Sequence, residues 1–197
     1  MTATPIRLAV LVGSVREGRL APVVVDWFTG RTRTRADLDV DVIDLADHPL
    51  PLTRAACVET PSGDAGRRHR ELAARLAAAD AFVVVTPEYN HSYPAALKNV
   101  LDWYLDEWAA KPAGFVSYGG LGGGLRAVEH LRQVFAELHA VTVRNGVSFH
   151  HPWELVGGDG RLSAPAESEA AAKAMLDQLV WWARALRTAR SASPYRR

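Results

Sequence analysis

The sequence predicts a single α/β domain in which helices cover both faces of a mostly parallel sheet. Short apolar runs of strand length alternate along the chain with segments whose apolar residues recur every three or four positions. Several of these runs are apolar throughout, which is typical of strands buried on both faces. The 197 residues, 48% of them hydrophobic, suffice for one sizeable core.

The first half of the chain opens with a continuous apolar run at 6–12, expected to be a strand. Helical spacing predicts a helix over 22–29. Residues 38–43 alternate apolar side chains with aspartates, the pattern of an edge strand. An irregular, proline-containing stretch at 44–66 precedes a helix expected over 67–79.

The second half continues this alternation to the end of the domain. The expected elements are strands at 81–85, 113–117 and 140–143, with 147–149 as a further candidate, and helices at 94–108, 125–138 and 165–188. Right-handed crossovers in so short a chain favour a five-stranded parallel sheet in the order 2-1-3-4-5, a flavodoxin-like three-layer sandwich. We expect residues 1–188 to form this domain and 189–197 to be a basic, solvated tail.

Charge and cysteine content narrow the class of protein. A formal net charge of +1 indicates neither a nucleic-acid nor a membrane partner. The single cysteine, Cys57, permits no intramolecular disulfide and fits a cytoplasmic protein. The run at 6–12 is too short to span a bilayer and contains Arg7. His150 and His151 are adjacent, and no spaced ligand set predicts a metal site.

The loop after the first strand, Gly13–Arg19, has the composition of a phosphate site. Glycines permit a tight turn, and the backbone N–H groups at a helix start attract anions. Ser14 adds a hydroxyl donor, and Arg16 or Arg19 can pair with phosphate through two parallel hydrogen bonds. An ordinary turn with surface arginines is the competing interpretation.

Two nucleotide motifs nearly fit this loop. Gly13 and Gly18 have the spacing of the triphosphate-binding P-loop, but Arg19 and Leu20 replace its lysine and its hydroxyl residue. The dinucleotide pattern G-x-G-x-x-G fails at Val15. A mononucleotide phosphate is the ligand that remains.

A second candidate loop, 87–93, follows the central strand directly. Glu88 and Asn90 offer groups for polar ring edges or a sugar-like chain. The residues expected to stack on a ring or line a pocket are Tyr89, His91 and Tyr93. An ordinary helix start, capped by Ser92 with Pro94 in the first turn, would explain only the second half of this segment.

A third candidate loop, 117–124, contains five glycines in six positions, so a group is expected to approach its backbone closely. All three loops end strands near the switch point of the predicted sheet, where ligands bind in open α/β folds. The sequence has no nucleophile elbow and no outstanding pair of carboxylates. We therefore expect no catalytic side chain and a cofactor that carries the chemistry.

Three segments together resemble the NADPH-dependent FMN reductase family, which includes azoreductase-, quinone- and chromate-reductase-type members. The segments are Gly-Ser-Val-Arg at 13–16, Thr-Pro-Glu-Tyr-Asn-His-Ser-Tyr-Pro-Ala-Ala-Leu-Lys-Asn at 86–99 and Ser-Tyr-Gly-Gly at 117–120. The similarity in element order extends to about Leu186. The resemblance implies non-covalent FMN, a homodimer or dimer of dimers, and hydride transfer from NAD(P)H through the flavin to an acceptor.

The resemblance also implies roles for individual residues. Those implied to hold the FMN phosphate are Ser14, Arg16, Glu17, Gly18 and Arg19. Those implied to hold the ribityl chain and ring are Pro87, Glu88, Tyr89, Asn90 and His91. Those implied to support the far side of the ring are Ser117, Tyr118, Gly119 and Gly120. Many relatives have a small hydroxyl residue where this chain has Arg19, so the role of Arg19 stays open between phosphate contact and solvent.

Our leading hypothesis is an NAD(P)H oxidoreductase whose acceptor is a flavin, quinone, azo compound or metal oxyanion. The alternatives are a non-enzymatic FMN-binding or electron-transfer protein and, more distantly, a nucleotide-handling hydrolase or transferase. Tryptophans at 103, 108, 181 and 182, with Tyr104, favour a homodimer because aromatic residues are common at interfaces.

Overall fold

The computed structural model describes residues 4–53 and 63–196, so Cys57 lies outside the described residues. Its strands are β1 (Ile6–Val12), β2 (Leu38–Asp44), β3 (Ala81–Pro87), β4 (Pro112–Gly119), β5 (Val141–Thr142) and β6 (Val147–His150). Its helices are α1 (Ala21–Thr32), α2 (Gly63–Ala78), α3 (Ala95–Trp103), α4 (Leu125–Glu137), the 3₁₀-helix η1 (Pro152–Leu155) and α5 (Ala166–Ala192).

The strands form one parallel sheet in the order β2-β1-β3-β4-β5, with β6 also paired to β4. The predicted flavodoxin-like order is therefore confirmed. One edge differs from the prediction because β5 pairs with the start of β4 and β6 with its end. The chain leaves the sheet between them, where Arg132 donates hydrogen bonds to the carbonyls of Val143 and Arg144.

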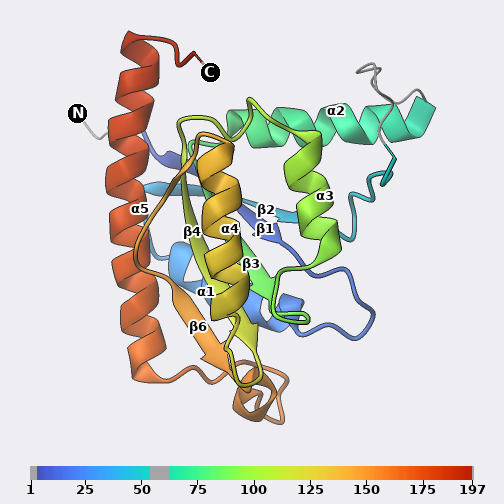
Figure 1. Ribbon diagram of the computed structural model, residues 1–197. Helices are drawn as coiled ribbons and strands as arrows, with labels where there is room; N and C mark the ends of the chain where they lie inside the picture. The colour runs from blue at the N-terminus through green and yellow to red at the C-terminus, as the bar shows by residue number, and fades with distance from the viewer. Residues whose placement is uncertain (1–3, 54–62, 197) are drawn as a thin grey trace.

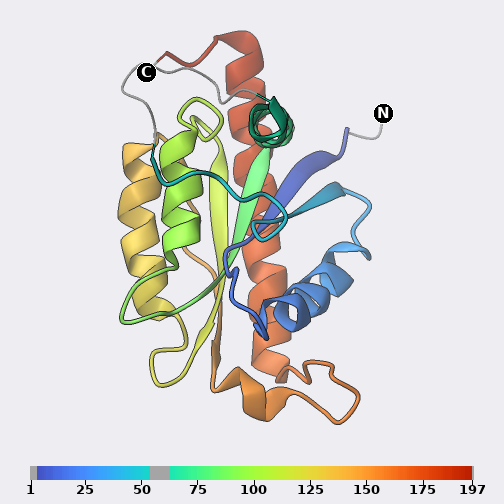
Figure 2. The ribbon, with the colours of Figure 1, turned by 90° about the vertical axis from the view of Figure 1, so that its right-hand side faces the viewer.

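Two apolar cores lie on opposite faces of the sheet, as the side-chain alternation of a strand requires. Leu8 and Val10 of β1 face the helices α1 and α5. Ala9 and Leu11 face α2, α3 and α4. Figure 2 shows the resulting layers, with α3 and α4 on one side of the sheet, α1 and α5 on the other, and α2 viewed nearly end-on.

The helix after β3 is shorter than the predicted 94–108. It ends at Trp103, and Tyr104 is extended, with φ −118° and ψ 139°. This extension lets the Tyr104 ring stack on His69 of α2, 5.0 Å between centroids, so a tertiary contact overrides the helical pattern. Trp108 is fully buried beyond the helix. Tyr104 and Trp108, expected within that helix, thus join the core from outside it.

The last helix is longer than predicted and reaches Ala192, past the expected boundary at 188. Arg190, placed by the sequence in the solvated tail, donates hydrogen bonds to Ala110 O and Asp80. Further along the chain, the Tyr195 hydroxyl bonds His139 Nδ1 at 2.8 Å. Within the described residues, no helix has the length and apolarity needed to cross a membrane.

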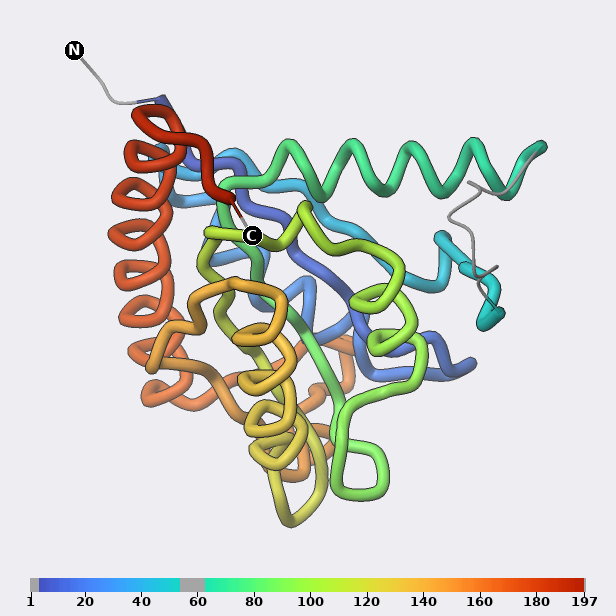
Figure 3. The backbone as a smooth tube through the Cα atoms, turned by 45° about the horizontal axis from the view of Figure 1, so that its top comes forward, coloured from blue at the N-terminus to red at the C-terminus, as the bar shows by residue number. Residues whose placement is uncertain are grey.

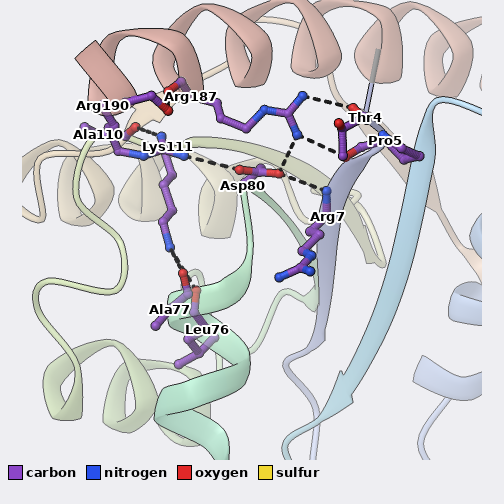
Figure 4. A network of polar contacts seen from close by, with 11 residues as sticks. Thr4, Pro5, Arg7, Leu76, Ala77, Asp80, Ala110, Lys111, Arg187 and Arg190 are labelled. Atoms are coloured by element: carbon purple, nitrogen blue, oxygen red, sulfur yellow. Dashed lines mark hydrogen bonds and ion pairs between the residues drawn. The ribbon is translucent and has the colours of Figure 1, made fainter. Parts of the chain in front are cut away.

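The amino ends of β3 and β4 are joined by a polar network (Figure 4). Asp80 accepts hydrogen bonds from Arg7 N and Arg187, and Arg190 lies 3.4 Å from it. Lys111 is 6% exposed and donates to the carbonyls of Leu76 and Ala77, the last turn of α2. Burial lowers the pKa of Lys111 to about 8. This network lies at the opposite end of the sheet from the candidate loops (Figure 1).

Candidate functional site

The carboxyl ends of β1, β3, β4 and β6 lie at one edge of the sheet. The three loops that the sequence singled out begin there, so the structure brings them together as expected. Figure 3 shows the narrow turn after β3, in light green, beside the yellow loop between β4 and α4.

Ser14 and Tyr89 join the first loop to the second. Ser14 is fully buried, and its Oγ lies 2.7 Å from Tyr89 Oη. The guanidinium of Arg16 lies over the Tyr89 ring, 3.4 Å from the centroid, which is a cation–π contact. Within the described residues Arg16 has no carboxylate partner. Its positive charge is therefore available for an anion at this loop.

The Arg19 guanidinium binds two groups of the protein itself. Its Nη1 donates to the Ser14 carbonyl at 2.7 Å, and its Nη2 lies 2.6 Å from Asp44 Oδ2. The Arg19 side chain is 16% exposed, so it does not point to solvent. Sequence reasoning missed Asp44, although its place as the last residue of β2 puts it at the carboxyl edge of the sheet.

The second loop turns tightly at Asn90 and His91. Both residues have positive φ, 49° and 74°, and Tyr89 and Ser92 exchange two backbone hydrogen bonds around them. This is the geometry of a type I′ hairpin turn. Within the described residues the amides of Asn90 and His91 make no backbone hydrogen bond, so both N–H groups are free for a ligand. Ser92 bonds His130 and does not cap α3.

Glu88 points away from this turn and into the glycine loop. Its carboxylate accepts a hydrogen bond from Arg126 N at 3.2 Å and pairs with the Arg126 guanidinium at 2.8 Å. The side chain is only 8% exposed. A carboxylate at the first turn of α4 also has a favourable interaction with the helix dipole. Glu88 thus links the second loop to the third.

Most of the glycines in the third loop make room for the protein's own groups. A Cβ at Gly122 would lie 2.7 Å from Glu88 Oε1, and one at Gly123 would lie 2.4 Å from Ser148 Oγ. At Gly124, which has φ +86°, a Cβ would lie 2.5 Å from Ser117 Cβ. The sequence predicted that some group approaches this backbone closely. The groups that do so are largely side chains of the protein itself, such as Glu88, Ser148 and Ser117.

Ser117 and Tyr118 lie on opposite faces of β4. Ser117 Oγ donates to Gly123 O at 3.0 Å and so fixes the glycine loop. Tyr118 is 6% exposed, and its hydroxyl is buried without a hydrogen bond of normal geometry among the described residues. Burial raises the pKa of Tyr118, although nearby Ser14 acts in the opposite direction. This neutral hydroxyl is a hydrogen-bond donor without an acceptor among the described residues.

The segment after β6 adds groups that sequence reasoning left as plain loop residues. His151 has φ 47°, and its N–H donates to Gly119 O at 2.8 Å. A Cβ at Gly120 would be 3.7 Å from Trp153 Cη2, so the indole lies beside the open face of this glycine. Trp153 is 55% exposed. The available signal was their position directly after a strand at the same edge.

The donors that the three loops bring together fit FMN. The Arg16 guanidinium, the amides of Asn90 and His91 and the Tyr118 hydroxyl have no acceptor among the described residues, and they supply donors for a phosphate and for the oxygens of a flavin. Among the described residues no group of three or more His, Cys, Asp or Glu side chains is placed to hold a metal ion. The fold and these loops define a mononucleotide-binding protein of the flavodoxin-like class.

Comparison with known proteins identifies the family. A family model described as NADPH-dependent FMN reductase matches residues 6–154. An NAD(P)H-dependent FMN reductase of Schizosaccharomyces pombe is 39% identical over 60% of this chain and 60% of its own length. An FMN-dependent NADPH-azoreductase of Staphylococcus haemolyticus is 30% identical over 87% of this chain and 92% of its own. The chain therefore belongs to the NADPH-dependent FMN reductase family and is an oxidoreductase.

A solved structure agrees in fold. The flavoenzyme NAD(P)H:(acceptor) oxidoreductase FerB from Paracoccus denitrificans superposes with a TM-score of 0.72. The two chains are 23% identical, and the superposition covers 91% of this chain and 98% of FerB. At this identity the likeness concerns the fold, which matches the topology described above.

Proposed function

We propose that this protein holds FMN non-covalently at the carboxyl edge of its sheet and passes hydride from NAD(P)H through it to a small acceptor. The observation that carries the proposal is the convergence of the Arg16 guanidinium, the free amides of Asn90 and His91, and the unpartnered Tyr118 hydroxyl. Each is a donor for which the described residues provide no hydrogen-bond acceptor, and together they match a ligand with a phosphate at one end and carbonyl oxygens at the other.

The three loops would divide the cofactor between them. Ser14, Arg16 and the backbone through Gly18 would bind the phosphate. The turn after Tyr89 would face the ribityl chain and ring. Tyr118 with Gly119 and Gly120 would lie along the far side of the ring, where no side chain projects from the two glycines. Glu88 and Ser117 would act indirectly, because both are bonded to the glycine loop.

Bound FMN supplies the hydride-transfer chemistry of such an enzyme. The protein's part is to bind, orient and shield. Tyr118 would stay protonated through the neutral range, because burial raises its pKa, and so would donate a hydrogen bond without losing its proton. Trp153 and His151 would flank the space in which nicotinamide and acceptor take turns. As acceptors we propose flavins, quinones, azo compounds or metal oxyanions.

The decisive experiment is an absorbance spectrum of the purified protein with and without added FMN, followed by anaerobic titration with NADH and NADPH. We expect flavin absorbance that bleaches on addition of a nicotinamide and returns on addition of a quinone. A protein that stays colourless after FMN is added would refute the proposal. Bound FMN that neither nicotinamide reduces would instead favour a non-enzymatic flavin carrier.

We further propose a homodimer, or a dimer of dimers, in the cytoplasm. Trp181 is 64% exposed and packs edge-on against Trp182, and such surface aromatics are common at interfaces. Trp103, Tyr104 and Trp108 are buried within the chain and carry no such argument. Light scattering on a size-exclusion column tests the proposal, and a single monomeric peak at working concentration would rule it out.

A further inference from the structure

The ion pair between Arg19 and Asp44 lies at the base of the phosphate loop, and the proposed function gives it no role. Asp44 ends β2 and is the register partner of Val12, the last residue of β1. Arg19 ends the loop that Val12 begins, so the pair spans the loop's entry and exit. Its partners are 16% and 23% exposed, which shields the interaction from solvent more than an ordinary surface pair.

Arg19 also holds the inside of the loop. Its Nη1 donates to the Ser14 carbonyl at 2.7 Å while Nη2 pairs with Asp44. Ser14 in turn shares a hydrogen bond with Tyr89. Asp44 is fixed from its other side, because Oδ1 accepts the Ala46 N–H at 3.0 Å. The guanidinium therefore ties the loop's backbone to a carboxylate with a fixed position on the sheet.

Arg16 is in the opposite situation. It extends over the Tyr89 ring and has no carboxylate partner within the described residues. A phosphate that approaches this loop meets one cation whose charge is free and one whose charge is already neutralised at 2.6 Å by Asp44. The two arginines thus have different electrostatic roles although the sequence places them three positions apart.

We propose that Asp44 and Arg19 are positioning residues that preorganise the phosphate loop, while contact with the phosphate stays with Arg16 as in the proposed function. This inference rests on the proposed FMN site. For the loss of the Asp44 charge, it predicts a change in phosphate affinity opposite in sign to the change expected from electrostatics alone. Removing the negative charge of Asp44 would strengthen phosphate binding if charge alone mattered, or if Arg19 were freed to bind phosphate. If the Arg19–Asp44 ion pair acts as a tether, breaking it loosens the loop and weakens phosphate binding.

The test measures dissociation constants for FMN and for riboflavin, which lacks the phosphate, by flavin fluorescence. The variants are Asp44→Asn, Arg19→Met, the two combined, and Arg16→Met, with Arg33→Met at the exposed end of α1 as a matched loss of one charge. Circular dichroism and thermal melting confirm that each variant is folded. Asp44→Asn keeps the shape of the side chain, so it stays informative if a larger change unfolds the protein.

We expect Asp44→Asn and Arg19→Met each to weaken FMN binding ~5-fold, and the double variant to be no worse than either single variant, since both cut the same tether. Arg16→Met should weaken FMN binding ~10- to 100-fold, the effect of a charge-assisted hydrogen bond. Riboflavin affinity should change little in all of them. Raising the salt concentration should weaken FMN binding in wild type and Arg19→Met alike, but much less in Arg16→Met.

Tighter FMN binding by Asp44→Asn would overturn the proposal, as would a salt dependence that disappears in Arg19→Met and persists in Arg16→Met. Additive losses in the double variant would also contradict a shared tether. Failure of the wild-type protein to bind FMN at all is a different result, because it refutes the proposed function itself. The two failures are therefore distinguished within one titration series.

Discussion

Gly124 offers the sharpest test of how the third loop is built. Its φ of +86° is a conformation that L side chains rarely adopt, and an added Cβ would lie 2.5 Å from Ser117 Cβ and 2.7 Å from Tyr118 N. Gly160 has a similar φ of +75° but nothing within 4 Å of the same position. The pair Gly124→Ala and Gly160→Ala therefore separates the cost of a steric clash from the cost of backbone strain.

The left-handed conformation costs an alanine about 1–2 kcal/mol, which applies to both variants. Alanine also restricts the unfolded chain and so returns up to about 1 kcal/mol in each. At Gly124 the clash is with backbone and with a buried side chain, neither of which can rotate away, so overpacking adds about 1–3 kcal/mol. We expect Gly160→Ala to lose about 1 kcal/mol of unfolding free energy and Gly124→Ala about 2–4 kcal/mol.

Urea unfolding of both variants and the wild type, followed by circular dichroism, measures this difference. With a slope of about 2 kcal/mol per molar, the midpoint of Gly124→Ala should lie about 0.5–1.5 M below that of Gly160→Ala. Equal slopes for all three proteins would show that the comparison is valid. Midpoints within about 0.2 M of each other would refute the view that the Gly124 backbone is packed against β4.

Three further predictions concern single side chains. Lys111 has a pKa of about 8 in the folded protein against 10.5 in the unfolded chain, so the unfolded chain binds more protons between these values. The free energy of unfolding of wild type relative to Lys111→Met should therefore rise by about 3 kcal/mol from pH 8 to pH 10.5. A difference in urea midpoint between the two proteins that does not change with pH would contradict this. Glu88→Ala removes the acceptor for Arg126 N and should cost about 1–2 kcal/mol in the same assay, while Glu88→Gln should cost less than half as much. Tyr118→Phe removes a buried hydroxyl that has no hydrogen-bond partner among the described residues, so it should raise the melting temperature of the FMN-free protein and weaken FMN binding about 5-fold. A lower melting temperature, or an unchanged FMN affinity, would contradict the assigned role.

Much of the fold could be predicted from the sequence because its signals are local. The apolar runs that became β1, β3 and β4 are long enough to be unambiguous, and the crossover rule then fixed their order. The errors occurred where long-range contacts decide the structure. Tyr104 leaves the helix to reach His69, and Arg132 separates β5 from β6 by binding carbonyls that a longer strand would have used. Neither partner is near in sequence.

The candidate site divides in the same way. Its location follows from strand ends and glycines, which are visible in the sequence. Which side chains face the ligand is set by partners from other elements, such as Asp44 for Arg19 and Arg126 for Glu88. A motif places Glu88 in the right loop but cannot show that its carboxylate turns toward α4. The roles of these site residues stay predictions that the binding experiments above would test.

The two borders of the sheet bear on how copies of this chain can meet. β2 is an edge strand with Asp39 and Asp41 exposed along it, and Arg75 of α2 pairs with Asp41. On the other side β5 is two residues long and is interrupted before β6 begins. Charged or broken borders discourage strand-to-strand addition of a second sheet. Both borders therefore disfavour self-association through added strands, and concentrated protein should resist the fibrous aggregation to which open sheet edges are prone.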